Sequence, residues 1–441
     1  MPKITIREID NTGSDTSSYV VEHTVLVPAI NTEGNYLNGL YTSKDQFKDK
    51  INEYLNDADT TTTSEDKKNQ VADDSIAYIL TILNQGLPVQ YFGAYDSLTA
   101  TQTWTESDVT DLYEDFKDRG LYDLLFITTG VIENDLVSNA AIDCAASRGD
   151  AVAILSTLES YIPTEMTSNN KKLAEAVDNA INTNLTSAKN TVSRDGVSFT
   201  ETETAGSYAA IFTPKFTSSY IKGYDGNTIY EDVDKKILKP FPASLNYLVC
   251  FAKSLRKNAP EWFAISGTDR GASPLTPIEL AEEYGDAAVA IYQTRGLKAE
   301  NEANHISTNV ICNIRPYGNI IWGNRTMNPL GTGKSNGVYQ LTASDFLNIR
   351  LLACSLKKTL YRAARKRTFE PNSDILWFNF KSDVEPLLEN MKNNQGIRGY
   401  KIVKLATNKK ALLSARITIS PIEAVEDFDF TVEFADSIDV E

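Results

Sequence analysis

A phosphate-binding loop is the first chemistry that the sequence suggests. Gly333, Lys334 and Ser335 stand together in "NPLGTGKSNG", in the order that such loops use to hold nucleotide phosphates. The motif needs a glycine five residues before Gly333, where this chain has Asn328. It also needs a helix directly after the serine, whereas "SNGVYQL" predicts a turn and an extended stretch. We therefore expect a connecting loop and no cofactor, and we keep a nucleotide-binding enzyme as an alternative.

Nucleophilic and metal-assisted catalysis have few residues to use. The chain contains two histidines, His23 and His305, so a Ser-His or Cys-His arrangement must include one of them. His23 lies at the start of an apolar run and His305 lies in the polar stretch "ENEANHIST", and no GxSxG motif is present. Neither a DxDxDG loop nor an HExxH helix occurs. We expect no catalytic residue and no metal site, and therefore no enzyme.

A basic helix face is the most asymmetric feature of the chain. The helix expected in "TASDFLNIRLLACSLKKTLYRAARKRTF" has apolar residues on one side, and Lys358, Arg362, Arg365 and Lys366 on the other. Seven cations and no anion lie between Ile349 and Arg367. One reading is a solvated face that complements the helix dipole. The other is a docking surface for an acidic partner.

The length, composition and net charge of the chain exclude several classes of protein. The chain has 441 residues with 41% hydrophobic residues, enough for two or three domains with ordinary cores. Its 43 Lys and Arg against 59 Asp and Glu give a net charge of -16, which argues against a general nucleic-acid binder. No apolar run approaches the length of a membrane span, and the start carries charges where a signal peptide would be apolar. We expect a soluble protein made in the cytoplasm, with no nucleic-acid or membrane partner. Its four separated cysteines should be buried free thiols.

The periodicity of the chain predicts α/β and α+β regions. The clearest signal is the strand "YDLLFITTG" from Tyr122, followed by a helix and the strand "DAVAIL", which predicts a parallel pair. Helices are expected in "YTSKDQFKDKINEYL", in "DDSIAYILTILNQG", in "PASLNYLVCFAKSLRKNAP" under Ser244, and after Pro277. "NVICNIRPYGNIIWGNRTM" predicts a hairpin. The helix "KSDVEPLLENMKNNQG" and the strands "YKIVKLA" and "ARITISPI" are expected near the C-terminus.

Both ends of the chain read as amphipathic strands. Near the N-terminus, Ile4 and Ile6 alternate with polar residues, and the polar stretch "NTGSDTSS" follows. Near the C-terminus, "VEDFDFTVEF" alternates strictly, with apolar residues at Phe428, Phe430, Val432 and Phe434. A strand on a polar tether can fold back or add to the sheet of another subunit.

Several segments, in this order, resemble the tail sheath protein of contractile-tailed bacteriophages and related contractile injection systems. The less specific segments are "TSKDQF", "SRGDAVAIL", "AAIFTPKF" and "PASLNYLVCFAKS". The more specific ones are the hairpin "NVICNIRPYGNIIWGNRTM" and the stretch "FLNIRLLACSLKKTLYRAARKRTFEPNSDILW". The resemblance runs from about residue 40 to the end of the chain.

The resemblance implies an architecture of four parts. Residues 1–22 and 423–441 would be arms that add strands to neighbouring subunits. Residues 23–335 would form a central α/β region, with two subdomains and a subtilisin-like arrangement without protease activity. Residues 336–422 would form a C-terminal α+β domain that faces an inner tube, with the basic helix against an acidic tube surface.

The resemblance also implies a structural function. Subunits would stack as hexameric rings, forming a helical sheath around an inner tail tube, and contraction would drive the tube through the envelope of a target cell. The tube, baseplate and tail terminator proteins would be the partners, in a virion tail assembled in the host cytoplasm. A surface or adhesion module that does not polymerise is a further alternative.

Overall fold

The computed structural model describes most of the chain in separate stretches. The described residues are 23–30, 37–56, 74–94, 109, 113–161, 170–192, 204–218, 221–224, 229–231, 240–275, 278–280, 306–329, 334–335, 338–339, 342–407 and 411–424. The strands expected around Ile4 and Ile6 and at Phe428 to Phe434 lie outside them, as do His305 and Gly333.

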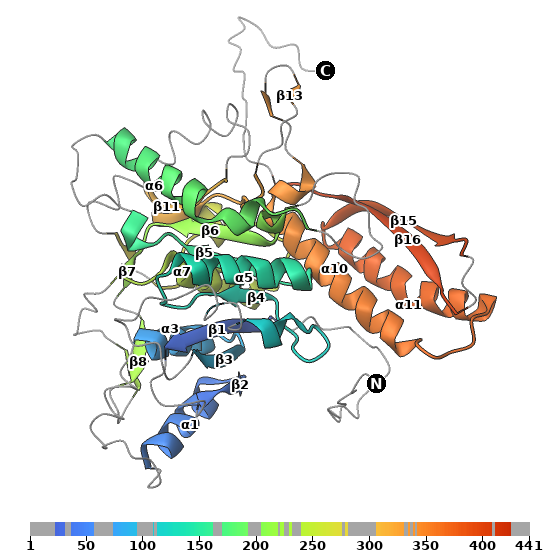
Figure 1. The fold of residues 1–441 in the computed structure, drawn as a ribbon, viewed down its shortest axis with the longest axis horizontal. Helices are drawn as coiled ribbons and strands as arrows, with labels where there is room; N and C mark the ends of the chain where they lie inside the picture. Colours follow the sequence, from blue (N-terminus) through green and yellow to red (C-terminus); the bar gives the residue numbers. More distant parts are fainter. Residues whose placement is uncertain are drawn as a thin grey trace, which may run out of the picture.

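A mixed eight-stranded sheet lies at the centre of the described part of the chain (Figure 1). In order across the sheet, its strands are β12 (Gly318–Trp322), β11 (Asn309–Ile314), β6 (Ala209–Thr213), β5 (Val152–Ser156), β4 (Phe126–Thr128), β1 (Val25–Ile30), β3 (Val89–Ala94) and β2 (Gly39–Tyr41). The six inner strands are parallel, and the two edge strands are antiparallel to their neighbours.

Helices cover both faces of this sheet because its strands are apolar on both sides. In β1, Val25 and Val27 belong to one core and Leu26 to the other. The first core includes residues of α1 (Lys44–Asn56), α3 (Asp74–Asn84) and α7 (Ala243–Arg256). The second includes residues of α5 (Asp135–Arg148) and α6 (Asn170–Asn184). The result is three layers with the sheet in the middle.

The strand, helix and strand expected after Tyr122 are present as β4, α5 and β5, and the two strands are parallel. Asn134 caps α5 by accepting backbone hydrogen bonds, and Gly149 ends it at a φ of 68°. The first strand begins at Phe126, four residues later than the sequence pattern indicates. The expected hairpin of β11 and β12 is also confirmed.

Two details of the expected helices are wrong. Ser244 does not cap α7, because the helix begins at Ala243 and Ser244 lies in its first turn, where its N–H donates to Ser156 Oγ at 2.8 Å. The residues directly after Pro277 form a strand, β10 (Ile278–Glu279), which pairs with β7 (Thr217–Ser218). The remainder of that expected helix, from residue 281, lies outside the described residues.

A second, smaller unit follows at the C-terminus and packs beside the sheet (Figure 1). It comprises α10 (Leu347–Lys366), α11 (Asp374–Asn393) and an antiparallel ribbon of β15 (Ile397–Leu405) and β16 (Ser414–Pro421). The second helix begins at Asp374, seven residues before the expected Lys381, because Ser373 caps it and Leu376 and Phe380 extend its buried side. The core of this unit includes Trp262, which comes from the loop after α7.

The four cysteines are buried and free, as expected. The fold as a whole is a mixed α/β structure with a large mixed sheet and a small antiparallel one.

Candidate functional site

The structure divides the four expected basic residues of α10 into two pairs. Arg365 and Lys366 are exposed in the last turn of the helix. The side chain of Lys358 is only 3% exposed, and that of Arg362 is 29% exposed. The expected basic surface therefore reduces to Arg365 and Lys366, because the other two cations face the rest of the chain.

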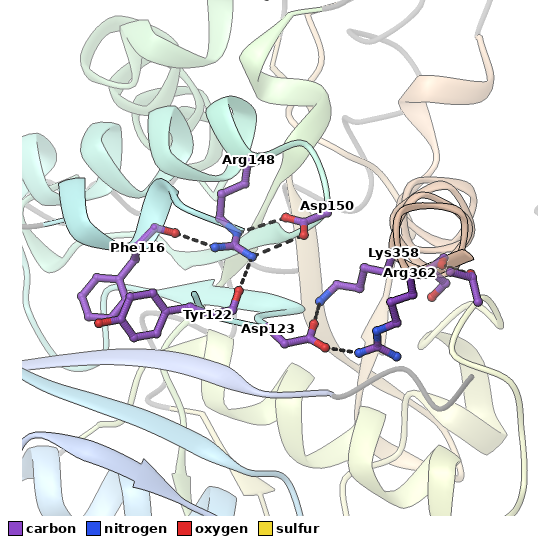
Figure 2. Close-up of polar contacts among 9 residues, drawn as sticks. Phe116, Tyr122, Asp123, Arg148, Asp150, Lys358 and Arg362 are labelled. Carbon is purple, nitrogen blue, oxygen red and sulfur yellow. Dashed lines mark hydrogen bonds and ion pairs between the residues drawn. The ribbon is translucent and has the colours of Figure 1, made fainter. Parts of the chain in front are cut away.

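Asp123 is the partner of both inward-facing cations. It lies in the segment before β4, and its two carboxylate oxygens accept hydrogen bonds from Lys358 Nζ and Arg362 Nη2 (Figure 2). Burial alone would raise the pKa of Asp123, but the two cations outweigh this and hold it below its ordinary value. We name Asp123, Lys358 and Arg362 the α10 junction.

The segment that carries Asp123 is fixed by a second buried cation. Arg148, at the end of α5, places Nε 3.0 Å from one oxygen of Asp150 and Nη2 3.3 Å from the other. The same guanidinium donates to the carbonyl oxygens of Phe116 and Tyr122 (Figure 2). Because Tyr122 directly precedes Asp123, this planar group of donors positions the junction.

The first half of α10 is buried on more than one side. Leu351 and Cys354 belong to a core of the sheet, whereas Leu352 and Leu356 belong to the core of the C-terminal unit. Two polar contacts also join α10 to Tyr208. The guanidinium carbon of Arg350 lies 4.1 Å from the centre of the Tyr208 ring, and Lys357 Nζ donates a hydrogen bond to the Tyr208 hydroxyl at 2.8 Å. The helix thus joins the two parts of the molecule.

His23 lies beside this junction. It stands two residues before β1, and its ring packs edge-on against Phe251 with ring centres 5.7 Å apart. Burial is the largest effect on the pKa of His23 and lowers it, and the charge of Lys358 lowers it further. The charges of Glu261 and Asp123 raise this pKa, but they do not outweigh burial. The imidazole is therefore held in its neutral form more strongly than in the unfolded chain.

The β15–β16 ribbon is the second candidate surface, since its edges are unpaired within the described chain. The two strands pair with each other over their length, and neither pairs with another described strand. One side of the ribbon packs on α11, with Ile402 and Ile417 directly opposite each other and close to the core of that unit. Two-stranded ribbons are marginal alone and can accept further strands.

The described residues of the segment considered for phosphate binding form a short strand pair. Lys334 and Ser335 form β13, which pairs antiparallel with β14 (Val338–Tyr339). Among the residues described after Ser335, the next helical turn begins at Ala343, whereas a phosphate-binding loop has a helix N-terminus directly after its serine.

Among the residues that the structure describes, no group of three or more His, Cys, Asp or Glu could hold a metal ion. In the same part of the chain, no helix combines the length and the apolar character needed to cross a bilayer.

Comparison with known proteins gives a short sequence match but no family match. No protein-family model matches the chain. The chain is 33% identical over 76 residues to the tail sheath protein of Vibrio phage KVP40, a match that covers 17% of this chain and 11% of that protein. The chain thus matches about a tenth of the length of this curated relative.

The fold is similar to solved structures over nearly its whole length. One is a sheath complex of an extracellular contractile injection system, PVC, in its contracted state, with a TM-score of 0.56, 14% identity, and 99% of this chain and 98% of that chain covered. Another is the baseplate of the anti-feeding prophage, with a TM-score of 0.55, 12% identity and 99% of each chain covered. The resemblance to tail sheath proteins and contractile injection systems is therefore confirmed.

Proposed function

We propose that this chain is the structural subunit of a contractile tail sheath. Subunits would stack as hexameric rings around an inner tail tube, and contraction would drive that tube through the envelope of a target cell. The observation that carries the proposal is the likeness to a contracted sheath complex over 99% of the chain, C-terminal unit included. The curated relative from Vibrio phage KVP40 bears the name of the same class of protein.

The proposed division of the chain follows the same reasoning. Residues 1–22 and 423–441 would be linking arms, residues 23–335 a central region with a subtilisin-like arrangement, and residues 336–422 a domain facing the tube. Because α10 contributes to the cores on both sides, the last two regions would move together as one body. Tube, baseplate and tail terminator proteins would be the partners in a virion tail assembled in the host cytoplasm.

Strand addition would link the subunits. Ile4 and Ile6 in one arm, and the residues Phe428, Phe430, Val432 and Phe434 in the other, would supply amphipathic strands. The β15–β16 ribbon supports this proposal because it offers edges that no other described strand covers. Main-chain hydrogen bonds would provide the affinity, and side-chain alternation would set which side of the added strand faces α11.

The tube contact would be made by the end of α10. Arg365 and Lys366 are exposed there, whereas Lys358 and Arg362 bind Asp123 within the same chain. Contacts between exposed charges weaken with salt and are reversible, which suits a tube that must slide.

The proposed role is not enzymatic. The energy of contraction would come from subunit packing in a metastable extended sheath. The pairing of β13, which contains Lys334 and Ser335, with β14 supports a structural role over nucleotide hydrolysis, because a phosphate-binding loop would place its lysine and serine at the start of a helix.

Negative-stain electron microscopy tests the proposal. The purified full chain is compared with a version that lacks residues 1–15, with and without co-expressed tube protein. Long hollow cylinders from the full chain and separate subunits from the truncated one are expected. Monomers from the full chain under both conditions would rule out the sheath role.

A further inference from the structure

The three most exposed large apolar side chains of the described residues lie close together in the chain. Phe369 is 94% exposed, Ile375 71% and Phe378 64%. Phe369 lies in the turn between α10 and α11, and the other two lie in the first two turns of α11, three positions apart and therefore on one side of that helix. We name these three residues the apolar tip. The turn lies at an end of the C-terminal unit that points away from the large sheet (Figure 1).

Phe369 is held in a conformation that its side chain disfavours. Its φ is 74°, in the left-handed region where bulky residues are rare and glycine is unstrained. Because the side chain is almost fully exposed, no burial within the described part of the chain offsets this strain. Strain of this kind persists only where the surrounding structure imposes it, and it clusters at binding and active sites.

Arg367 holds the turn in this conformation. Its guanidinium donates to both carboxylate oxygens of Asp383 on α11, at 2.8 and 3.2 Å, and to Glu370 at 3.1 Å. These bonds link the residues before and after Phe369 to each other and to the second helix. The turn is therefore preorganised, which lowers the entropic cost of binding a partner.

The charge that remains available beside the apolar tip is positive. Glu370 is already bound by the arginine of the turn, and Asp374 lies 2.8 Å from Lys404 Nζ. Arg365 and Lys366, in the last turn of α10, are exposed. An aromatic and apolar centre beside exposed cations has the composition of a protein-binding hot spot. Its partner should offer an apolar pocket with carboxylates at the rim.

We propose that the apolar tip anchors this chain to the inner tail tube, with Phe369 in an apolar pocket of the tube surface and with Arg365 and Lys366 beside carboxylates at the rim of that pocket. The inference rests on the proposed sheath function and adds an apolar part to the tube contact. The tube is the partner because the apolar tip continues directly from the exposed end of α10, which that function places against the tube. The apolar tip supplies most of the affinity, and the cations supply its dependence on salt.

Co-sedimentation of the full chain with polymers of the tube protein, at about 0.1 M and about 0.5 M salt, tests the inference. The tip variant carries Phe369→Gly, Ile375→Gln and Phe378→Gln. Its affinity for the tube should fall at least about tenfold, and the remaining affinity should keep the salt dependence of the wild type. The cation variant, Arg365→Glu with Lys366→Glu, should show a smaller loss and little dependence on salt.

The single variant Phe369→Gly separates a binding role from a structural one. Glycine adopts a φ of 74° without strain, and the lost side chain is exposed, so thermal unfolding should occur at the wild-type temperature or above it. Affinity for the tube should nevertheless fall at least about threefold, because the aromatic anchor is gone. A lower unfolding temperature with unchanged affinity would show that Phe369 is structural and would contradict the inference.

The control variant removes exposed apolar side chains elsewhere. It carries Leu121→Ser and Tyr317→Ser, at positions that are 60% and 59% exposed, and it should bind the tube as the wild type does. Thermal unfolding followed by circular dichroism verifies that each variant is folded.

The other outcomes are distinct. A tip variant that binds the tube as tightly as the wild type, while both form hollow cylinders, would overturn this inference and leave the sheath proposal standing. A tip variant that binds the tube normally but no longer forms cylinders would show that the apolar tip contacts a second copy of the chain, and the inference would again be wrong. A wild type that neither forms cylinders nor binds the tube would overturn the proposed function and this inference together.

Discussion

Asp123 and Lys358, which are 235 positions apart in the chain, form an ion pair that ties the C-terminal unit to the sheet. The lysine side chain is almost entirely buried, and Arg362 binds the second oxygen of the same carboxylate. A buried lysine needs an anionic partner, because desolvation of an unpaired charge is costly. The α10 junction therefore adds an electrostatic constraint to the apolar packing of α10.

Removal of the carboxylate at this junction should destabilise the fold. In Asp123→Asn, Lys358 stays buried without a negative partner, and we expect the free energy of unfolding to fall by about 3 kcal/mol. Urea unfolding at a concentration that keeps the chain monomeric measures this value. The double variant Asp123→Asn with Lys358→Met should recover most of the loss, since it removes both charges and keeps an unbranched apolar side chain in the site.

An exposed ion pair provides the control for that measurement. Lys257 and Asp269 are 2.8 Å apart with side chains 54% and 67% exposed. Asp269→Asn should lower the free energy of unfolding by less than about 1 kcal/mol. Equal losses in Asp123→Asn and Asp269→Asn would contradict the special role of the junction.

Arg148 should not be replaceable by lysine. Its guanidinium binds both oxygens of Asp150 and the carbonyl oxygens of Phe116 and Tyr122, and an ammonium group cannot span these acceptors. We expect Arg148→Lys to lower the free energy of unfolding by about 2–4 kcal/mol, because buried acceptors lose their donors. Urea unfolding gives the value, and a loss below about 0.5 kcal/mol would show that the lysine or water satisfies the site.

The sequence predicted local elements well but could not predict the α10 junction of Asp123, Lys358 and Arg362. The parallel unit of β4, α5 and β5 and the β11–β12 hairpin are specified by neighbouring residues, and both are confirmed. The partner of Lys358 is remote in sequence, so helical periodicity could show a basic face but not that a carboxylate covers half of it. A single carboxylate in "LYDLLF", just before a buried strand, was the available signal and was missed.

The start of α11 illustrates a second limit. Ile375 and Phe378 are exposed near its N-terminus while Leu376 and Phe380 are buried, so apolar residues lie on both sides of the first two turns. This hides the helical stripe that a sequence pattern would detect. The central place of β1 was also missed, because the order of strands in a sheet depends on contacts between distant segments.

Stability should fall as the solution becomes acidic, with two separate contributions. The folded pKa of His23 is lowered from its ordinary value of 6.5, so the unfolded chain binds a proton first and stability is lost as the pH falls below that value. The folded pKa of Asp123 is lowered from 3.8, so its contribution is present above that pH and is lost below it. Each group can contribute a slope of at most about 1.4 kcal/mol per pH unit.

Unfolding midpoints measured at intervals between about pH 8 and pH 3 test both contributions. His23→Gln should flatten the profile just below pH 6.5, and Asp123→Asn should flatten it below pH 3.8. A His23→Gln profile parallel to that of the wild type would contradict the inference that the folded state holds this imidazole neutral.

The thiols should be unreactive in the native chain. Burial raises the pKa of Cys144 and of Cys250 to about 12 and that of Cys312 to about 11, and it also raises the pKa of Cys354. The thiolate is the reactive form, so a disulfide reagent at about pH 8 should label less than one thiol per chain within minutes. The same reagent in denaturant should label all four cysteines. Rapid labelling of the native chain would show that one of these sites opens to solvent.

The exposed end of α10 should affect tube binding without affecting the fold. Arg365→Glu with Lys366→Glu changes two exposed residues, so the free energy of unfolding should stay within about 0.5 kcal/mol of the wild-type value. Co-sedimentation with the tube protein should fall at least about fivefold and should lose most of its dependence on salt, because the proposed contact is between exposed charges. The variant Lys48→Glu with Lys257→Glu controls for net charge. Unchanged co-sedimentation of the α10 variant would show that the tube contacts another part of the C-terminal unit, since Lys358 and Arg362 are already bound to Asp123.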